Sequence, residues 1–153
     1  MTLLLIALSG GTDAERIAIA DRLIESGKES LAAFAVMTPG VNRPLRRSMI
    51  LRDALDTAQD KTTKNPAGGL VIVHCLTEEE ARVVRAQGGV IWHVYGTPSD
   101  QVVNRQGDFN VTAKGESFRH VLAPLDALSE LVLPRLRAVA PLCAGAIDAL
   151  ARA

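Results

Sequence analysis

The sequence predicts an α/β fold, a three-layer sandwich built around a mainly parallel sheet of five strands. Apolar runs of strand length alternate with segments of helical periodicity along the chain, and this order is typical of parallel sheets that have helices on both faces. Residues 69–75 form a continuous apolar run with β-branched side chains, as expected for a strand buried on both faces. Since the 153 residues contain no internal repeat, we expect a single domain over 1–153.

The first half of the chain is expected to begin with two strands and two helices. Residues 3–8 are an apolar run that predicts the first strand, and the helix after it is expected to end at Gly27, because glycine is a frequent C-terminal stop. Residues 30–36 predict a second strand. Pro44 suits the first position of a helix, and apolar residues recur at helical spacing over 44–58.

The second half continues this alternation. Thr77 and Glu80 have the spacing of a capping box, in which each side chain satisfies a backbone N–H at a helix start. Residues 96–117 are polar and rich in Gly, Asn and Asp, which favours a lid or long loop. The other expected elements are strands over 69–75, 90–95 and 118–122, and helices over 77–87, over 125–139 and from Pro141 onward.

Charge and composition exclude several classes of function. The 17 basic and 17 acidic side chains cancel, and a pI of about 6.8 leaves no basic footprint for nucleic acid or for an acidic membrane. The apolar run at 3–8 is too short for a signal peptide or a membrane span, so we expect a cytoplasmic protein with no membrane partner. Cys75 and Cys143 have no CxxC spacing and are expected to be buried thiols. The three histidines lack metal-ligand spacing, so we expect no metal site.

The turn after the first strand is where nucleotide-binding α/β domains hold a phosphate. A P-loop, GxxxxGK[ST], uses glycines to wrap the backbone around phosphates, a Lys to reach the outer phosphates and a hydroxyl to hold Mg²⁺. If Gly10 is taken as the first glycine, Glu15 and Arg16 occupy the positions of the second glycine and the lysine. Ile17 and Ala18 then follow, so neither position offers a hydroxyl for the metal.

Thr12 and Glu15 have the spacing of a capping box of their own. The Glu15 carboxylate would then occupy the positive end of the helix dipole, where a phosphate would otherwise bind. We therefore favour a self-capped helix over a phosphate site at this turn. If a nucleotide does bind here, the expected contacts are Ser9, Gly10, Gly11, Thr12 and Arg16.

Residues 70–98, LVIVHCLTEEEARVVRAQGGVIWHVYGTP, resemble the matching part of phage-type deoxynucleoside monophosphate kinases. That family has a strand followed by Asp-x-Arg-Phe-x-Asn-Glu-Ala, a helix, a Gly-Gly pair and a strand that ends in Arg-Pro; residues 80–81 match the Glu-Ala, and 88–89 match the glycine pair. The opening LSGGTDAERIAIADRL (8–23) is similar to the family's P-loop segment, and PLRR (44–47) to its Pro-Leu-Lys. The resemblance implies a P-loop kinase fold with the first strand in the centre of the sheet.

The departures from the family pattern fall on the residues that carry phosphate and metal chemistry. Without the Lys and the Mg²⁺ hydroxyl, the parts that stabilise charge in phosphoryl transfer are missing. The resemblance thus implies a kinase scaffold with a degenerate Walker A motif. The departures are Glu15, Arg16, Ile17 and Ala18 for Gly-Lys-Asp-Thr, His74 for the strand-end Asp, Leu76 for Arg, and Gly96 for the Arg before Pro.

Three arginines and two histidines remain as candidate site residues outside the turn. In a kinase, Arg43, Arg46 and Arg47 are candidates to grip a substrate phosphate. Arg46, Arg47 and Arg52 lie on the polar face of the helix over 44–58, and on most helices such side chains form a solvated face, which we favour. His74 ends a strand beside the turn and is, with Arg16, a candidate catalytic residue; a hydrogen-bonded structural histidine is the favoured interpretation. His93 lies inside a predicted strand and is expected to be structural.

Three functions follow from these observations. The favoured one is a non-catalytic, kinase-like binding or assembly protein, a pseudokinase of phage or prophage type, with a protein partner or a second copy of the chain. The second is a working deoxynucleoside monophosphate kinase that uses ATP and Mg²⁺, with Arg16 in place of the lysine. The third is a nucleotide sensor without turnover. Apolar residues over 141–152 favour self-association, unless they close the core of the domain itself.

Overall fold

The predicted α/β architecture is confirmed in a computed structural model, which describes residues 4–36, 44–59, 68–96, 99, 101–114 and 116–134. A parallel sheet of six strands has the order β2-β3-β1-β4-β5-β6. The strands are β1 (Leu4–Ser9), β2 (Leu31–Phe34), β3 (Gly69–Ile72), β4 (Val90–Val94), β5 (Phe109–Val111) and β6 (Val121–Leu122). The helices are α1 (Asp13–Glu25), the 3₁₀ turn η1 (Lys28–Ser30), α2 (Pro44–Gln59), α3 (Glu78–Ala86) and residues 124–134.

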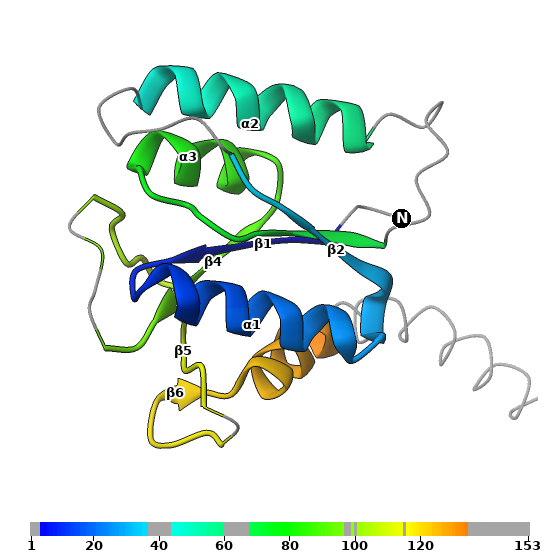
Figure 1. The fold of residues 1–153 in the computed structure, drawn as a ribbon, viewed down its shortest axis with the longest axis vertical. Coiled ribbons are helices and arrows are strands. Elements are labelled where there is room, and N and C mark those ends of the chain that lie inside the picture. The colour runs from blue at the N-terminus through cyan, green and yellow to red at the C-terminus, as the bar shows by residue number, and fades with distance from the viewer. Residues whose placement is uncertain are drawn as a thin grey trace, which may run out of the picture.

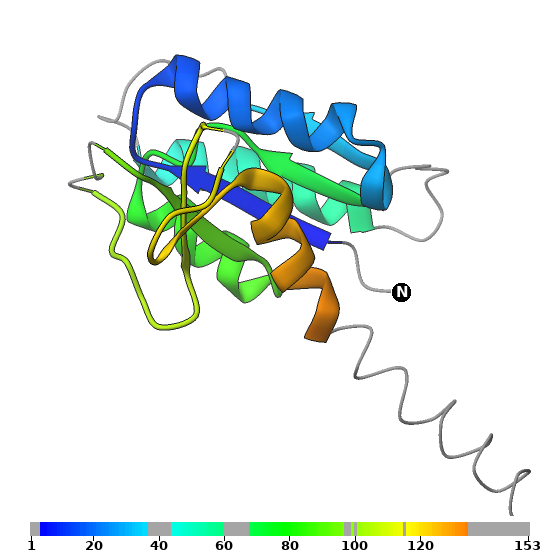
Figure 2. The ribbon, with the colours of Figure 1, turned by 90° about the horizontal axis from the view of Figure 1, so that it is seen from below.

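Helices cover both faces of the sheet. Figures 1 and 2 show α2 and α3 on one face and α1 with residues 124–134 on the other. Successive side chains of a strand point to opposite faces, so the strands contribute to two separate hydrophobic clusters. Leu4, Ile6 and Leu8 of β1 join the cluster under α1, whereas Leu5 and Ala7 join the cluster under α2 and α3. All six residues of β1 are therefore buried.

Strand β1 occupies the centre of the sheet, as expected. Its register places Ile6 beside Val71 of β3 and Val90 of β4. The carboxyl ends of β1, β3 and β4 consequently meet at one edge of the sheet, which is where open α/β sheets bind their ligands. The candidate residues at positions 9–16, 74 and 93 all follow or end these three strands.

The helix boundaries follow the predicted caps and stops. Thr12 is the N-cap of α1, and Gly27 follows this helix in the left-handed conformation with φ 69°. Thr77 is the N-cap of α3, and Gly88, with φ 83°, follows its last turn. Glycine adopts this conformation without the steric cost that a Cβ imposes. The capping side chains and the glycines that follow the helices therefore fix where both helices begin and end.

The expected loop over 96–117 contains an additional strand, which raises the sheet from five strands to six. This is β5, which pairs in parallel with β4 and β6. Its Phe109 stacks on Trp92, with ring centroids 6.4 Å apart. A strand of three residues is too short to show an alternating pattern in the sequence. The predicted strand over 118–122 is reduced to β6, after a tight turn in which Phe118 and Val121 form an antiparallel bridge.

Some expectations lie outside the described residues. They concern Arg43, Cys143 and the helix from Pro141 onward. Positions 97, 98, 100 and 115 of the expected loop over 96–117 also lie outside the described residues. Of the expected helix over 125–139, residues up to 134 are described and are helical from 124. No helix in the described residues is both long and apolar enough to cross a membrane.

Candidate functional site

The turn between β1 and α1, residues 9–12, depends on two glycines. Gly10 has φ 76° and Gly11 has φ 63°, both in the left-handed region. A Cβ on Gly11 would lie 2.6 Å from Cγ1 of Val94. The second glycine is thus required both by the backbone conformation and by the close approach of β4. Ser9, the residue before this pair, is fully buried, and its Oγ has no hydrogen-bond partner in the described part of the chain.

The predicted capping box is present at the start of α1. Thr12 Oγ1 accepts a hydrogen bond from Glu15 N at 3.2 Å, and Glu15 Oε1 accepts one from Thr12 N at 3.1 Å. The Glu15 carboxylate therefore lies at the N-terminus of the helix, where the dipole favours a negative charge. A phosphate bound at this helix end would meet that carboxylate.

The Arg16 side chain is buried beneath the turn, with only 4% of the residue exposed. Its NH1 donates to the Gly10 carbonyl at 2.7 Å and to the Gly11 carbonyl at 3.2 Å. Its NH2 pairs with the Asp13 carboxylate, and its Nε donates to Nδ1 of His74 at 3.1 Å. All three guanidinium nitrogens are engaged within the protein. We call these five residues the Arg16 cluster.

The Arg16 cluster reverses the polarity of a phosphate-binding loop. In a P-loop, backbone N–H groups face inward and cradle the anion. Here two carbonyl oxygens of the turn face a buried cation. A phosphate at this position would need the guanidinium to leave and the two carbonyls to turn away.

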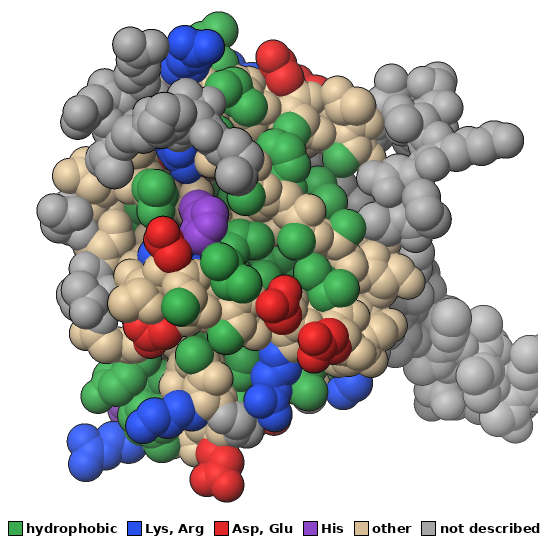
Figure 3. Space-filling model, viewed as in Figure 1, with side chains coloured by type: hydrophobic (Ala, Val, Ile, Leu, Met, Phe, Trp, Pro, Cys, Tyr) green, Lys and Arg blue, Asp and Glu red, His purple; other side chains and the backbone are tan. Residues whose placement is uncertain are grey.

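His74 follows β3 and is the member of the cluster that comes from another strand. Because Nδ1 accepts from Arg16, the ring proton of the neutral form is on Nε2. Partial burial lowers the pKa of His74 below its ordinary value of 6.5, and the Arg16 guanidinium lowers it further, although Asp13 opposes this. The favoured interpretation, a hydrogen-bonded histidine, agrees with this geometry. Figure 3 shows that acidic and basic side chains are scattered over the face of the molecule seen in this view.

The expectation that Arg47 belongs to a solvated face is wrong. Only 2% of Arg47 is exposed, and its Nε pairs with Oε1 of the fully buried Glu80 at 2.5 Å. It also donates through NH2 to the His74 carbonyl at 3.3 Å. Arg47 lies four and eight residues before Leu51 and Leu55, which are both fully buried, so it belongs to the face of α2 that packs on α3. Arg47 therefore joins two helices and is enclosed by the protein.

The neighbouring Arg46 is exposed, as expected of a solvated face. Glu80 pairs with Arg47 and also belongs to the start of α3, where its N–H donates to Thr77 Oγ1 as predicted. The other half of the predicted capping box differs, because the Glu80 carboxylate accepts from the Leu76 N–H and not from the Thr77 N–H. Glu80 Oε1 accepts from Thr77 Oγ1 at 3.1 Å. The helical spacing of Arg47 with the buried leucines of α2 is the sequence signal that could have placed it in this interface.

A second ionic network lies near the carboxyl end of β4 and was not predicted from the sequence. Asp108 Oδ2 accepts from His93 Nε2 at 2.8 Å, from Arg85 NH2 at 2.7 Å and from the backbone N of Arg105 at 3.0 Å. Glu78 pairs with Arg85 and with Arg105. These contacts attach the chain around 103–108 to α3 and β4. Asp108 thus orients the His93 ring.

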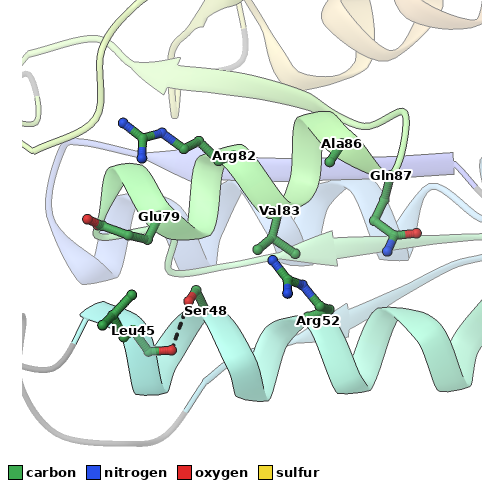
Figure 4. A pocket seen from close by; sticks show the side chains of 8 residues that line it. All are labelled: Leu45, Ser48, Arg52, Glu79, Arg82, Val83, Ala86 and Gln87. Atoms are coloured by element: carbon green, nitrogen blue, oxygen red, sulfur yellow. Dashed lines mark hydrogen bonds between the residues drawn. The ribbon is translucent and has the colours of Figure 1, made fainter.

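A cavity of about 600 Å³ adjoins this network. His93, Tyr95 and Asn110 are among the side chains that line it. A second and smaller hollow, about 310 Å³, lies between α2 and α3. Figure 4 shows Arg52 from α2 and Val83 from α3 pointing toward one another across this hollow.

The described residues offer little redox or metal chemistry. They contain no group of three or more His, Cys, Asp or Glu side chains placed to hold a metal ion. Cys75 is fully buried, and burial raises the pKa of its thiol, so the thiolate that reacts with oxidants and metals is strongly disfavoured. This agrees with a reduced structural cysteine.

Comparisons with protein-family models, with curated proteins and with solved structures find no match to this chain.

Proposed function

We propose that this chain is a non-catalytic relative of the P-loop nucleotide kinases and acts as a binding or assembly protein. One observation carries the proposal: the Arg16 guanidinium occupies the space beneath the turn and is held there by the Gly10 and Gly11 carbonyls. The central position of β1 and the strand–turn–helix order support the kinase-like scaffold.

The charges at the turn oppose phosphoryl transfer. Glu15 holds a negative charge at the helix end, and Asp13 is the partner of the buried guanidinium. Kinases stabilise the transferred phosphoryl group with a lysine and with Mg²⁺, whereas here the single cation of the turn already has partners. Moving Arg16 outward would break hydrogen bonds to a charged group, each worth about 1.5–3 kcal/mol.

The exposed part of α2 supports a macromolecular partner. Leu45 and Met49 are four residues apart on α2, and they are 71% and 63% exposed. Residues at this spacing are neighbours on one face of a helix. They lie at the end of α2 that borders the hollow between α2 and α3, which Leu45 lines. Such adjacent exposed apolar side chains are suited to contact a protein partner or a second copy of the chain.

Calorimetric titration tests the loss of phosphate binding. The full chain is titrated with ATP, dATP and deoxynucleoside monophosphates, with and without Mg²⁺. We expect absent or millimolar binding that Mg²⁺ does not change. Micromolar binding that depends on Mg²⁺ would contradict the proposal, and product in a coupled phosphorylation assay would support the working kinase instead.

A restored loop provides the matched variant. The double substitution Glu15→Gly and Arg16→Lys returns the Gly-Lys pair of the family pattern, and we expect it to bind ATP more tightly than the natural chain. Arg22→Lys, which changes an exposed arginine on the same helix, is the control.

A second pair of substitutions tests the assembly role. If the partner is a second copy of the chain, Leu45→Ser combined with Met49→Ser should reduce self-association measured by light scattering.

A further inference from the structure

The cavity of about 600 Å³ lies at the carboxyl end of β4 and beside β5. This is the edge of the sheet at which α/β folds hold small molecules. One of the residues that line the cavity, Val94, is the residue that a Cβ on Gly11 would meet. The volume of the cavity falls in the range of ordinary small-ligand pockets, ~300–1,000 Å³. The position and the size therefore both suit a small ligand.

The described residues that line the cavity favour a neutral ligand. Apart from His93, they carry no ionisable group that is charged near neutral pH. The charged side chains nearby are paired with one another, since Asp108 accepts from Arg85 and Arg105 pairs with Glu78. No arginine or lysine among the described lining residues is available to bind a phosphate or a carboxylate. A neutral compound avoids the cost of leaving a charge unpaired.

His93 lines this cavity and has one ring nitrogen that can accept a hydrogen bond. A carboxylate only accepts hydrogen bonds, so the 2.8 Å contact with Asp108 Oδ2 places a proton on His93 Nε2. In the neutral ring, Nδ1 then carries a lone pair. In the described part of the chain, this Nδ1 has no hydrogen-bond partner. A ligand N–H or O–H group can donate to it.

Asn110 is the cross-strand neighbour of His93 and lies beside Asn104. Asn104 Nδ2 donates to Asn110 Oδ1 at 3.1 Å. This contact leaves Oδ1 of Asn104 as an acceptor and Nδ2 of Asn110 as a donor. An adjacent acceptor and donor match an amide group or the edge of a nucleobase, which is how asparagine reads adenine in nucleic acids.

Tyr95 adds an aromatic surface to the same cavity. Its ring is exposed and contacts Phe118 edge to face, with centroids 5.1 Å apart. An exposed aromatic ring can stack on a planar ring of a ligand. The cavity thus combines one acceptor, an amide-like edge and an aromatic surface.

We propose that this cavity binds a neutral, planar nitrogen heterocycle with an amide-like edge, the class of the free nucleobases and of nicotinamide. His93 Nδ1 accepts a hydrogen bond from the ligand, the Asn104–Asn110 pair contacts the amide-like edge, and Tyr95 packs against the ring. The described residues that line the cavity do not include those of the turn at 9–12, so the proposal does not require that the proposed function be correct.

NMR of the full chain labelled with ¹³C-histidine tests the site. Uracil, adenine and nicotinamide are added separately, and the His93 signal is assigned from the spectrum of His93→Gln. We expect at least one compound to shift the His93 signal saturably while the exposed His120 signal remains unchanged. Absence of any saturable shift at millimolar concentrations of all three compounds would overturn the proposal. Inorganic phosphate is titrated in the same way, and binding of phosphate as tight as or tighter than that of the three compounds would overturn the preference for a neutral ligand.

Two variants separate this site from the turn. Asn104→Ala removes an exposed side chain and is expected to fold, and it should weaken binding about five- to tenfold, the effect of one neutral hydrogen bond. Arg16→Ala should leave the affinity unchanged. If instead Arg16→Ala abolishes the His93 shift and Asn104→Ala does not alter it, the ligand binds elsewhere and the proposal is wrong. Neither result depends on whether the chain binds ATP.

Discussion

Arg16 Nε donates a hydrogen bond to His74 Nδ1 over 3.1 Å and so joins the first turn of α1 to the residue pair that follows β3. The donor belongs to a side chain that also holds the glycine turn after β1. The acceptor exists only while His74 Nδ1 is unprotonated. The same contact therefore links the shape of the turn to the protonation of one histidine.

We expect the stability of the protein to fall as the pH drops below 6.5. The pKa of His74 is lowered in the folded state from its ordinary 6.5. Between the folded and unfolded pKa values the unfolded chain binds more protons, so stability rises with pH across this window and is lost as the pH falls through it. Protonation would also place a positive charge on His74 beside those of Arg16 and Arg47, with Asp13 and Glu80 partly compensating.

Urea unfolding at a series of pH values measures this effect. His74→Gln should flatten the dependence of the unfolding free energy on pH in this window. His120→Gln, which changes an exposed histidine, is the control and should leave the dependence as it is in the natural chain. An unchanged slope in His74→Gln would refute the prediction.

Arg16→Ala should destabilise the protein by about 2–3 kcal/mol. The substitution removes hydrogen bonds from a charged donor and leaves the Gly10 and Gly11 carbonyls without it. The pair with Asp13 adds little, because that carboxylate is exposed. Arg22→Ala, on the exposed side of the same helix, should stay within about 0.5 kcal/mol. Equal effects of the two substitutions in denaturant unfolding would contradict a structural role for Arg16.

Substitution of Arg47 alone or of Glu80 alone should strongly lower the free energy of unfolding. Removing one partner leaves the other as a buried unpaired charge, which costs about 3–5 kcal/mol. Arg47→Met combined with Glu80→Leu removes both charges, so we expect the double variant to be more stable than the sum of the two single changes. Strict additivity in the double-mutant cycle would show that the two side chains do not interact.

Alanine substitutions at Gly27 and Gly11 distinguish the cost of backbone strain from the cost of steric crowding. Gly27→Ala places a Cβ in open space at φ 69°, so it should cost about 1–2 kcal/mol from the left-handed conformation alone. Gly11→Ala has a similar φ of 63°, but its Cβ would also meet Val94 at 2.6 Å. We therefore expect a larger loss of unfolding free energy at Gly11. A smaller loss at Gly11 would mean that β4 moves aside freely.

Much of the fold could be predicted because its signals are local. The caps at Thr12 and Thr77 act over three residues, and the left-handed glycines at 27 and 88 directly follow their helices. The apolar runs predicted four of the strands on which the sheet is built. The strand at Phe109–Val111 was not predicted, because three residues are too few to show an alternation of apolar and polar side chains. It is a strand only through its pairing with its neighbours in the sheet, such as β4.

The candidate site was predicted less completely. The departure of Glu15 and Arg16 from a P-loop pattern and the capping of Thr12 were both read from the residues. The direction of the Arg16 side chain was not, and Arg47 was placed in solvent although its spacing matched the buried leucines of α2. Asp108 stood in a polar segment with nothing to distinguish it from other loop acids.

The sequence by itself determined the succession of strands and helices and where the helices begin and end, because hydrophobic period and caps act between residues a few positions apart. Only the tertiary structure decided which charged and polar groups meet. Arg16 and His74 are 58 positions apart, and Arg47 and Glu80 are 33 apart. These pairs form because the strand order brings β3 beside β1 and packs α2 on α3. Buried charges need such partners, and the partners are supplied by the packing of the sheet and its helices.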